Sequence, residues 1–170
     1  MTDNMEILDL RSAPERLNDV IDQNYRQWGP FTGLDRSSME SLFTSDINAP
    51  RDQLPFTLIA IVNQKYSGVV SLRTISMGAL THPEEYLPNV GPWLSNMWVA
   101  EDCRGRGLAT RLAVRLETNA LARGISRIYS STLVADSLYH KLGFTNICTR
   151  IHGPQELHII CKDLVPAGIS

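Results

Sequence analysis

The spacing of apolar and polar residues predicts helices in the first third of the chain and mainly strands after it. A short apolar run over residues 6–10 predicts a strand, and the capping pattern S-x-x-E at residues 12–15 then predicts a helix to about residue 27. We expect the W-G-P run at residues 28–30 to end this helix. The same capping pattern at residues 37–40 predicts a second, short helix over residues 38–44.

The remaining apolar runs switch between strand and helix patterns. Helices are expected over residues 107–123, ended by Gly124, and over residues 135–142. This order of elements predicts a mixed sheet with helices on its faces. The strands are expected at residues 6–10, 56–62, 68–75, 93–100, 128–132, 144–150 and 156–161, with a hairpin turn at residues 63–67.

Composition and charge narrow the possible classes of function. The 170 residues are 43% apolar and 20% charged, so we expect one globular domain over residues 1–170. A formal net charge of -2 gives no general attraction to nucleic acid or to an anionic membrane, and neither is expected as a partner. The polar N-terminus and the lack of a long apolar run favour a cytoplasmic protein. Cys103, Cys148 and Cys161 lack the paired spacing of zinc or disulfide sites, so free thiols and no metal ion are expected.

The string C-R-G-R-G-L-A at residues 103–109 lies between a predicted strand and a predicted helix. Glycines at positions 105 and 107 let backbone N–H groups turn toward one point, and the start of the helix adds a partial positive charge. Arg104 and Arg106 can add charge-assisted hydrogen bonds to phosphate oxygens. The string therefore predicts an anion-binding loop.

Spacing separates the kinds of phosphate loop that could be present. A Walker loop needs Gly-Lys followed by Ser or Thr, and a dinucleotide fingerprint needs a third glycine where Thr110 stands. The pattern that remains is R-x-x-G-x-A, formed by Arg104, Gly107 and Ala109. Further along the chain comes L-Y-x-x-x-G-F at residues 138–144. In these two motifs the sequence resembles the GNAT superfamily of acyl-CoA N-acyltransferases.

The resemblance implies the GNAT fold, an α+β fold in α/β/α layers with a mixed, mostly antiparallel sheet of about six or seven strands and helices on both faces. It also implies that acetyl-CoA is the cofactor and that its pantetheine arm lies along the strand at Met97, Trp98 and Val99. Strand alternation would place Met97 and Val99 on one face of the sheet and Asn96 and Trp98 on the other. Further cofactor contacts are expected from Arg104, Gly105, Arg106, Gly107, Leu108, Ala109, Thr110, Thr132 and Ser137.

Acetyl transfer needs a polarised carbonyl and a proton for the departing thiolate. The resemblance gives Tyr139 as the general acid, and a phenol with a pKa of about 10 stays protonated at neutral pH, as this role requires. We expect the backbone N–H of Val99 to polarise the thioester carbonyl.

Base candidates lie in the longest predicted connection, residues 76–92, which is rich in glycine and proline. Loops of this length in compact domains are usually functional or disordered. An acceptor amine with a pKa of about 10.4 is protonated at neutral pH and must lose a proton before it attacks. Glu84 and Glu85 are the preferred candidates for this base. His82 of the same connection and Glu101, which follows the strand predicted at residues 93–100, are further candidates. The alternative is that the two glutamates belong to a solvated loop or to the first turn of a short helix capped by Thr81.

These features together predict an N-acetyltransferase that moves the acetyl group of acetyl-CoA directly to a primary amine. The amine could belong to a small molecule, an amino acid or a peptide N-terminus, and the protein could be a monomer or a homodimer. Two other classes stay open. A catalytically inactive acyl-CoA-binding sensor or interaction module would bind CoA without transfer, and a nucleic-acid binder would use the arginines between residues 104 and 127, although the net charge counts against it.

Overall fold

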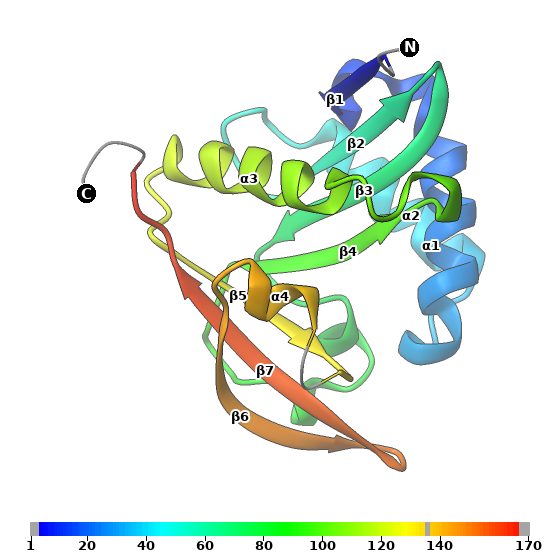
Figure 1. The fold of residues 1–170 in the computed structure, drawn as a ribbon. Coiled ribbons are helices and arrows are strands. Elements are labelled where there is room, and N and C mark those ends of the chain that lie inside the picture. The colour runs from blue at the N-terminus through cyan, green and yellow to red at the C-terminus, as the bar shows by residue number, and fades with distance from the viewer. Residues whose placement is uncertain (1–3, 135–136, 167–170) are drawn as a thin grey trace.

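A computed structural model describes residues 4–134 and 137–166 and contains a seven-stranded sheet (Figure 1). The strand order is β1-β2-β3-β4-β5-β7-β6, and β4 and β5 form its parallel pair while the other neighbours are antiparallel. The predicted mixed, mostly antiparallel sheet is confirmed. The strands are β1 Met5–Asp9, β2 Phe56–Val62, β3 Lys65–Arg73, β4 Trp93–Val99, β5 Arg127–Thr132, β6 Thr145–His152 and β7 Gln155–Asp163.

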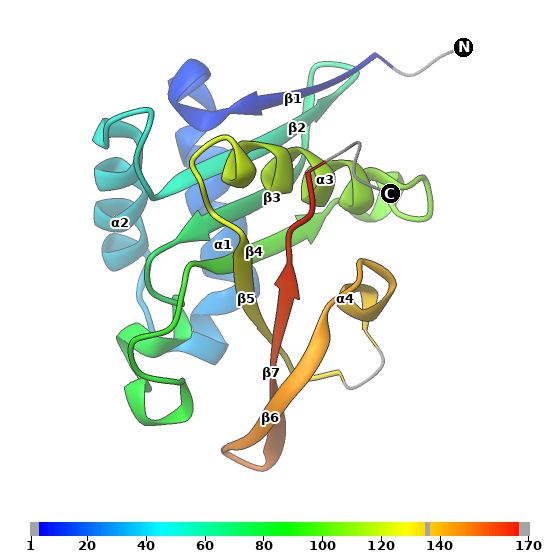
Figure 2. The same ribbon diagram turned by 90° about the vertical axis from the view of Figure 1, so that its left-hand side faces the viewer.

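Helices cover both faces of the sheet, as predicted. Figures 1 and 2 show α1 and α2 on one face and α3 on the other. The stripe of α3 at steps of four, Leu108, Leu112, Leu116 and Ala120, is fully buried in one apolar cluster with side chains of β2 and β3. A second cluster joins α1 and α2 to the opposite face. The α-helices of the described residues are α1 Leu17–Thr32, α2 Arg36–Asn48, α3 Leu108–Leu121 and α4 Leu138–Lys141.

The parallel pair β4 and β5 is held together at one end and then separates (Figure 1). Among the described residues, their paired position is Trp93 with Tyr129, where the Tyr129 N–H donates to the Pro92 carbonyl at 2.9 Å. From there β5 follows β7 through Thr132, whereas β4 stays with β3 through Val99. Backbone groups on the open edge of β4 therefore have no partner strand.

A bulge interrupts β4 at Asn96. This residue has a φ of 62°, and the register with β3 shifts between Val69 and Ser71. The buried Asn96 amide donates to the Ser71 hydroxyl at 3.1 Å, which stabilises the bulged backbone. The predicted placement of Met97 and Val99 on one face agrees with the structure, but the alternation does not continue across Asn96 to Leu94. Leu94, Met97 and Val99 all pack in the cluster that holds α3, because the extra residue reverses the alternation between them.

Helix boundaries differ from the predictions where local patterns misled them. Two short 3₁₀ turns replace the helix start predicted at residue 12, and α1 continues through Gly29 and Pro30 until Gly33 ends it with a φ of 71°. Pro30 lies in the last turn, where a missing backbone N–H costs little because Arg26, four residues earlier, is exposed. Helix α2 is capped by the carboxylate of Asp35, which accepts from the N–H of Ser38 at 2.7 Å.

The last predicted helix, over residues 135–142, is observed as the short α4, and positions 135 and 136 lie outside the described residues. None of the helices in the described ranges has the length and apolarity that crossing a membrane requires. Cys103, Cys148 and Cys161 carry free thiols, as predicted.

A buried ion pair joins α2 to the end of β3. The Arg73 guanidinium donates to both carboxylate oxygens of Asp46, one at 3.1 Å, and the two side chains are 6% and 4% exposed. Burial raises the pKa of Asp46, and the positive charge of Arg73 opposes this effect. The pair fixes α2 beside the strand that leads into the 76–92 segment.

We predict that Arg73→Met destabilises the fold by about 3–5 kcal/mol, because it leaves a buried carboxylate without its partner. The double variant Arg73→Met/Asp46→Leu should recover most of this loss, since neither charge is then buried. Urea denaturation of both single variants and the double variant measures the effect as a double-mutant cycle. A loss below about 1 kcal/mol in Arg73→Met would contradict the prediction.

Candidate active site

The loop between β4 and α3 presents backbone donors to solvent. Gly105 and Gly107 have φ values of 72° and 76°, and a Cβ at either position would meet nothing within 4 Å. The backbone conformation, rather than crowding, therefore requires glycine there. The first helical bond of α3 runs from the Arg111 N–H to the Gly107 carbonyl at 3.0 Å. The N–H groups of the preceding helical residues, 108–110, thus point out of the helix start, where they favour an anion.

Arg104 lies against the end of β4. Its Nε donates to the Val99 carbonyl at 3.0 Å, and its guanidinium is 3.9 Å from the Glu101 carboxylate. The side chain is half-exposed, so its remaining N–H groups stay accessible. Arg106 is exposed on the same loop. The two arginines predicted to bind phosphate therefore both lie on the loop before α3, and Arg104 also hydrogen-bonds to the last residue of β4.

A cleft of about 480 Å³ opens beside this loop. It brings together nine of the predicted cofactor-binding residues, which are Met97, Trp98, Val99, Arg104, Gly105, Gly107, Leu108, Ala109 and Thr110. Gln27 and Trp28 of α1, Cys103 and Leu138 complete its lining. The cleft follows the open edge of β4 from the α3 N-terminus toward α4.

The N–H of Val99 faces the open edge. The next residue, Ala100, donates its N–H to the Ser67 carbonyl beside β3 at 2.9 Å. Backbone directions alternate along a strand, so the N–H and carbonyl of Val99 point the other way, toward the side where β5 has diverged. The contact between the Val99 carbonyl and Arg104 agrees with this direction. The cleft is therefore bordered by a strand donor that no neighbouring strand uses.

A smaller pocket of about 60 Å³, called the inner pocket below, lies next to the cleft. Trp28 belongs to the walls of both cavities. Its indole N–H is buried and finds no acceptor among the described residues. The other lining residues are mainly small polar and aromatic ones: Phe31, Thr32, Ser76, Met77, Gly78, Tyr86, Leu94, Ser95, Asn96, Ser130, Ser131 and Tyr139.

Tyr139 lies on α4 and reaches the inner pocket. Its ring packs edge-on against Phe144 with 5.4 Å between the ring centres. Burial raises the pKa of Tyr139, and a hydrogen bond with Ser130 offsets part of this effect. The hydroxyl of Ser130 itself donates to the Leu94 carbonyl at 3.0 Å, which fixes its position between the separating strands. A phenol in this environment stays protonated at neutral pH.

The other predicted residues lie outside these cavities. The hydroxyl of Thr132 is hydrogen-bonded with the backbone of Val134 in a local turn. Ser137 precedes α4, and its buried hydroxyl has no partner among the described residues. Glu84 is exposed, and Glu85 turns toward the imidazole of His152. The roles of both glutamates as bases, and of Thr132 and Ser137 as cofactor ligands, stay predictions.

The predicted cap at Thr81 is wrong. The short 3₁₀ turn Pro83–Glu85 follows His82, and no side chain caps it. The Thr81 hydroxyl donates instead to the Thr32 carbonyl at the end of α1.

Sequence reasoning also missed Trp28, Asn96 and Ser130, since no motif marks them and long-range packing brings them to the pocket.

Comparison with known proteins gives a consistent result. The model of the acetyltransferase (GNAT) family matches residues 19–144. Similar solved structures include an acetyltransferase of the GNAT family from Streptococcus pneumoniae, at 17% identity and a TM-score of 0.69, covering 95% of this chain and 100% of that chain. An aminoglycoside 6'-N-acetyltransferase complexed with coenzyme A has 16% identity and a TM-score of 0.68, covering 96% and 99%.

A third similar structure is the acetyl transfer enzyme from Salmonella typhimurium that modifies the N-terminal serine of a 50S ribosomal subunit protein. It has 13% identity and a TM-score of 0.66, and the match covers 97% of each chain. No curated protein sequence matches the chain. At such low identities the structural likeness shows the fold alone.

The raised pKa of Tyr139 predicts how stability changes at high pH. Its contribution is fully present below the pKa of an unfolded tyrosine, about 10. It is lost as pH rises through the higher folded-state pKa, because the unfolded chain then releases a proton that the folded chain keeps. Stability of Tyr139→Phe should therefore fall less steeply than that of the wild type above about pH 10.

Urea midpoints measured from neutral pH to about pH 11 test this expectation. Tyr25→Phe is the control, since Tyr25 is 42% exposed, and it should follow the wild type. Parallel curves for the wild type and Tyr139→Phe would contradict the prediction.

Proposed function

The chain belongs to the GNAT acetyltransferase family, and from this premise we propose that it transfers an acetyl group from acetyl-CoA to a primary amine. The observation that carries the proposal is the separation of β4 from β5. It opens a cleft that runs from the N-terminus of α3, along the free edge of β4, to a pocket lined by Tyr139. Such a path suits a long cofactor with a diphosphate at one end and a reactive thioester at the other.

The proposed position of the cofactor follows from the donors along the cleft. The diphosphate lies at the backbone N–H groups of residues 108–110, where the helix start favours negative charge, with Arg104 and Arg106 beside it. The pantetheine arm lies along the open edge of β4 and bonds to it as an added strand would. The N–H of Val99 then donates to the thioester carbonyl and stabilises the charge that develops on its oxygen.

Tyr139 is the proposed general acid. The neutral amine nitrogen attacks the thioester carbonyl carbon, the carbon–sulfur bond breaks, and the nitrogen gives up one proton to a base or to solvent water. The departing thiolate takes the proton of the Tyr139 hydroxyl, which is returned from solvent. Burial keeps the phenol protonated until that moment, which is why its raised pKa supports the role.

The inner pocket supports an amine as the acceptor. A space of about 60 Å³ admits the amine-bearing end of a molecule and leaves the remainder outside. Hydroxyl and amide groups on its wall can accept hydrogen bonds from an amine. They belong to Thr32, Ser76, Ser95, Asn96, Ser130 and Ser131. Among the similar structures, one enzyme is an aminoglycoside acetyltransferase and another modifies a protein N-terminus, so both small-molecule and peptide amines belong in the first screen.

We predict that Tyr139→Phe lowers kcat by about 10²–10⁴, the usual worth of a positioned general acid, and changes the Kd for CoA less than threefold. The measurement is release of free CoA from acetyl-CoA in the presence of an amine panel that includes N-terminal peptides. Tyr25→Phe, whose side chain lines neither cavity, should keep full turnover. Equal turnover in wild type and Tyr139→Phe would remove the acid role. CoA binding by the wild type without transfer to any amine would favour the inactive module instead.

A second prediction isolates the loop at the start of α3. Gly107→Ala puts a side chain at a φ of 76° directly before the helix start where the diphosphate is proposed to bind, and it should weaken CoA binding roughly tenfold. Gly124→Ala is its matched control, because Gly124 has a φ of 74°, also meets nothing within 4 Å, and lies beyond the other end of α3.

Both variants should lose a similar 1–2 kcal/mol of stability, roughly the cost of a left-handed alanine, and only Gly107→Ala should lose CoA affinity. Calorimetric titration with CoA and urea denaturation measure the two quantities separately. Equal CoA affinity in the two variants would count against diphosphate binding at this loop.

A further inference from the structure

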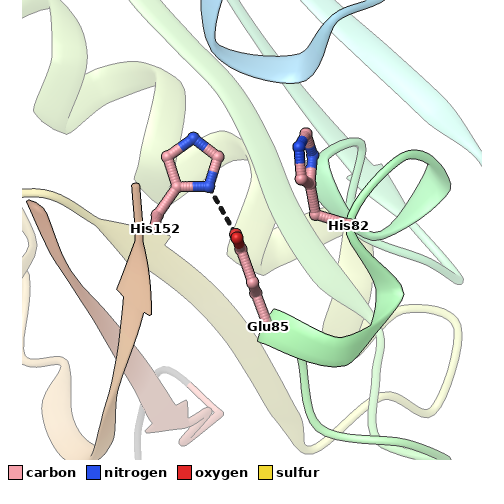
Figure 3. A group of neighbouring side chains, drawn as sticks. All are labelled: His82, Glu85 and His152. Carbon is pink, nitrogen blue, oxygen red and sulfur yellow. Dashed lines mark hydrogen bonds and ion pairs between the residues drawn. The ribbon is translucent and has the colours of Figure 1, made fainter. Parts of the chain in front are cut away.

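Two histidines and a glutamate meet beside the inner pocket (Figure 3). His82 and Glu85 come from the 76–92 segment, and His152 comes from the end of β6. One donor atom from each residue lies within 4.8 Å of the other two. The His152 Nδ1 is hydrogen-bonded to the Glu85 carboxylate, and the His82 and His152 rings stand edge to face with their centres 5.0 Å apart.

Hydrogen bonding fixes which nitrogen of His82 is available. The Thr81 hydroxyl has a single hydrogen, and it donates this hydrogen to the carbonyl of Thr32. Its oxygen also lies 2.9 Å from the Nδ1 of His82 and can only accept there. The Nδ1 of neutral His82 therefore carries the proton, and its Nε2 presents a lone pair.

The surroundings keep the cluster partly dry. The side chains of His152 and Glu85 are 15% and 13% exposed. The ring of Phe31 covers His152 with 4.2 Å between the ring centres, and Phe31 also lines the inner pocket. Burial and the contact with Phe31 therefore hold His152 and Glu85 in place, unlike side chains that are merely close to each other on the surface.

We propose that His82, Glu85 and His152 form a binding site for a divalent transition metal of the zinc class. Two imidazoles and one carboxylate are a donor set that suits Zn²⁺ and leaves a position for water. Ligands about 2.0–2.2 Å from one ion lie about 3.5 Å from each other, so the three donor atoms, which lie within 4.8 Å of one another, must move closer together when a metal binds. A metal at the His152 Nδ1 displaces the proton shared with Glu85, and that proton moves to Nε2 or to solvent.

Metal binding would join the 76–92 segment to the end of β6, beside the inner pocket where the acceptor amine is proposed to bind. The 76–92 segment supplies Met77, Gly78 and Tyr86 to the inner pocket, and the metal would tie this segment to β6. This site lies beyond the proposed acetyl transfer and does not depend on it. A Glu85 carboxylate bound to metal is not free to act as a base, so the proposal and the base prediction for Glu85 exclude each other.

The test uses the full chain, freed of metal by a chelator and titrated with Zn²⁺ in competition with a chromophoric chelator. We expect a single equivalent of Zn²⁺ to bind and the Tm to rise with free Zn²⁺. Co²⁺ in the same chain should give the visible bands of a nitrogen and oxygen site. It should lack the near-ultraviolet charge-transfer band of a thiolate ligand, which separates this site from the three cysteines.

Variants assign the ligands. His82→Ala and His152→Gln should each weaken Zn²⁺ binding on the order of 100-fold, and Thr81→Val should weaken it about tenfold by releasing the His82 tautomer. His152→Gln still provides a hydrogen-bond partner for Glu85, so its fold is protected, and near-ultraviolet circular dichroism verifies each variant. His158→Ala is the matched control, because this histidine of β7 is as little exposed as His152 and also lies near a carboxylate, 4.0 Å from Glu156.

Three results would overturn the proposal. The first is no saturable Zn²⁺ binding at micromolar free metal. The second is binding that His82→Ala and His152→Gln leave unchanged. The third is a thiolate band in the Co²⁺ spectrum. None of these results bears on acetyl-CoA binding or turnover, so failure of the metal site and failure of the proposed function are distinguishable.

Discussion

The structure depends on the contact that holds β4 and β5 together at one point. Trp93 is 2% exposed there, with its ring between those of Tyr86 and Tyr129 at 5.5 and 5.7 Å and its indole N–H donating to Val90 at 2.8 Å. Pro92 has no N–H to extend the pairing. Beyond this aromatic junction each strand is held by its antiparallel partner on the far side, so the sheet stays intact while its middle opens.

The local sequence was sufficient to predict those features that depend only on the conformation of the backbone nearby. The loop before α3 needs a positive φ at two positions, and the sequence has glycine at both, residues 105 and 107. The apolar stripe of α3 follows directly, so both features can be recognised in the sequence. The mixed sheet with helices on its faces followed from the order of elements along the chain, whereas the order of the strands within the sheet is known only from the structure. The family resemblance rested on the same local features, and the match over residues 19–144 confirms it.

Features that depend on contacts between distant parts of the chain could not be recognised in the sequence. The bulge at Asn96 depends on a hydroxyl of β3, and α1 continues past Pro30 because tertiary packing outweighs the local breaker. The cluster in Figure 3 joins positions from distant parts of the chain, so no spacing rule for metal ligands could reveal it. Side chains brought together by topology are visible only once the fold is known.

The indole N–H of Trp28, which has no acceptor in the part of the chain that the structure describes, has an energetic consequence for ligand binding. A buried N–H without an acceptor costs on the order of 1–3 kcal/mol, and an incoming carbonyl or hydroxyl oxygen that accepts from it removes that cost. The same ring borders the cleft and the inner pocket. An acceptor oxygen on a ligand that reaches this N–H therefore gains free energy that the same ligand would not gain from an indole already hydrogen-bonded within the protein.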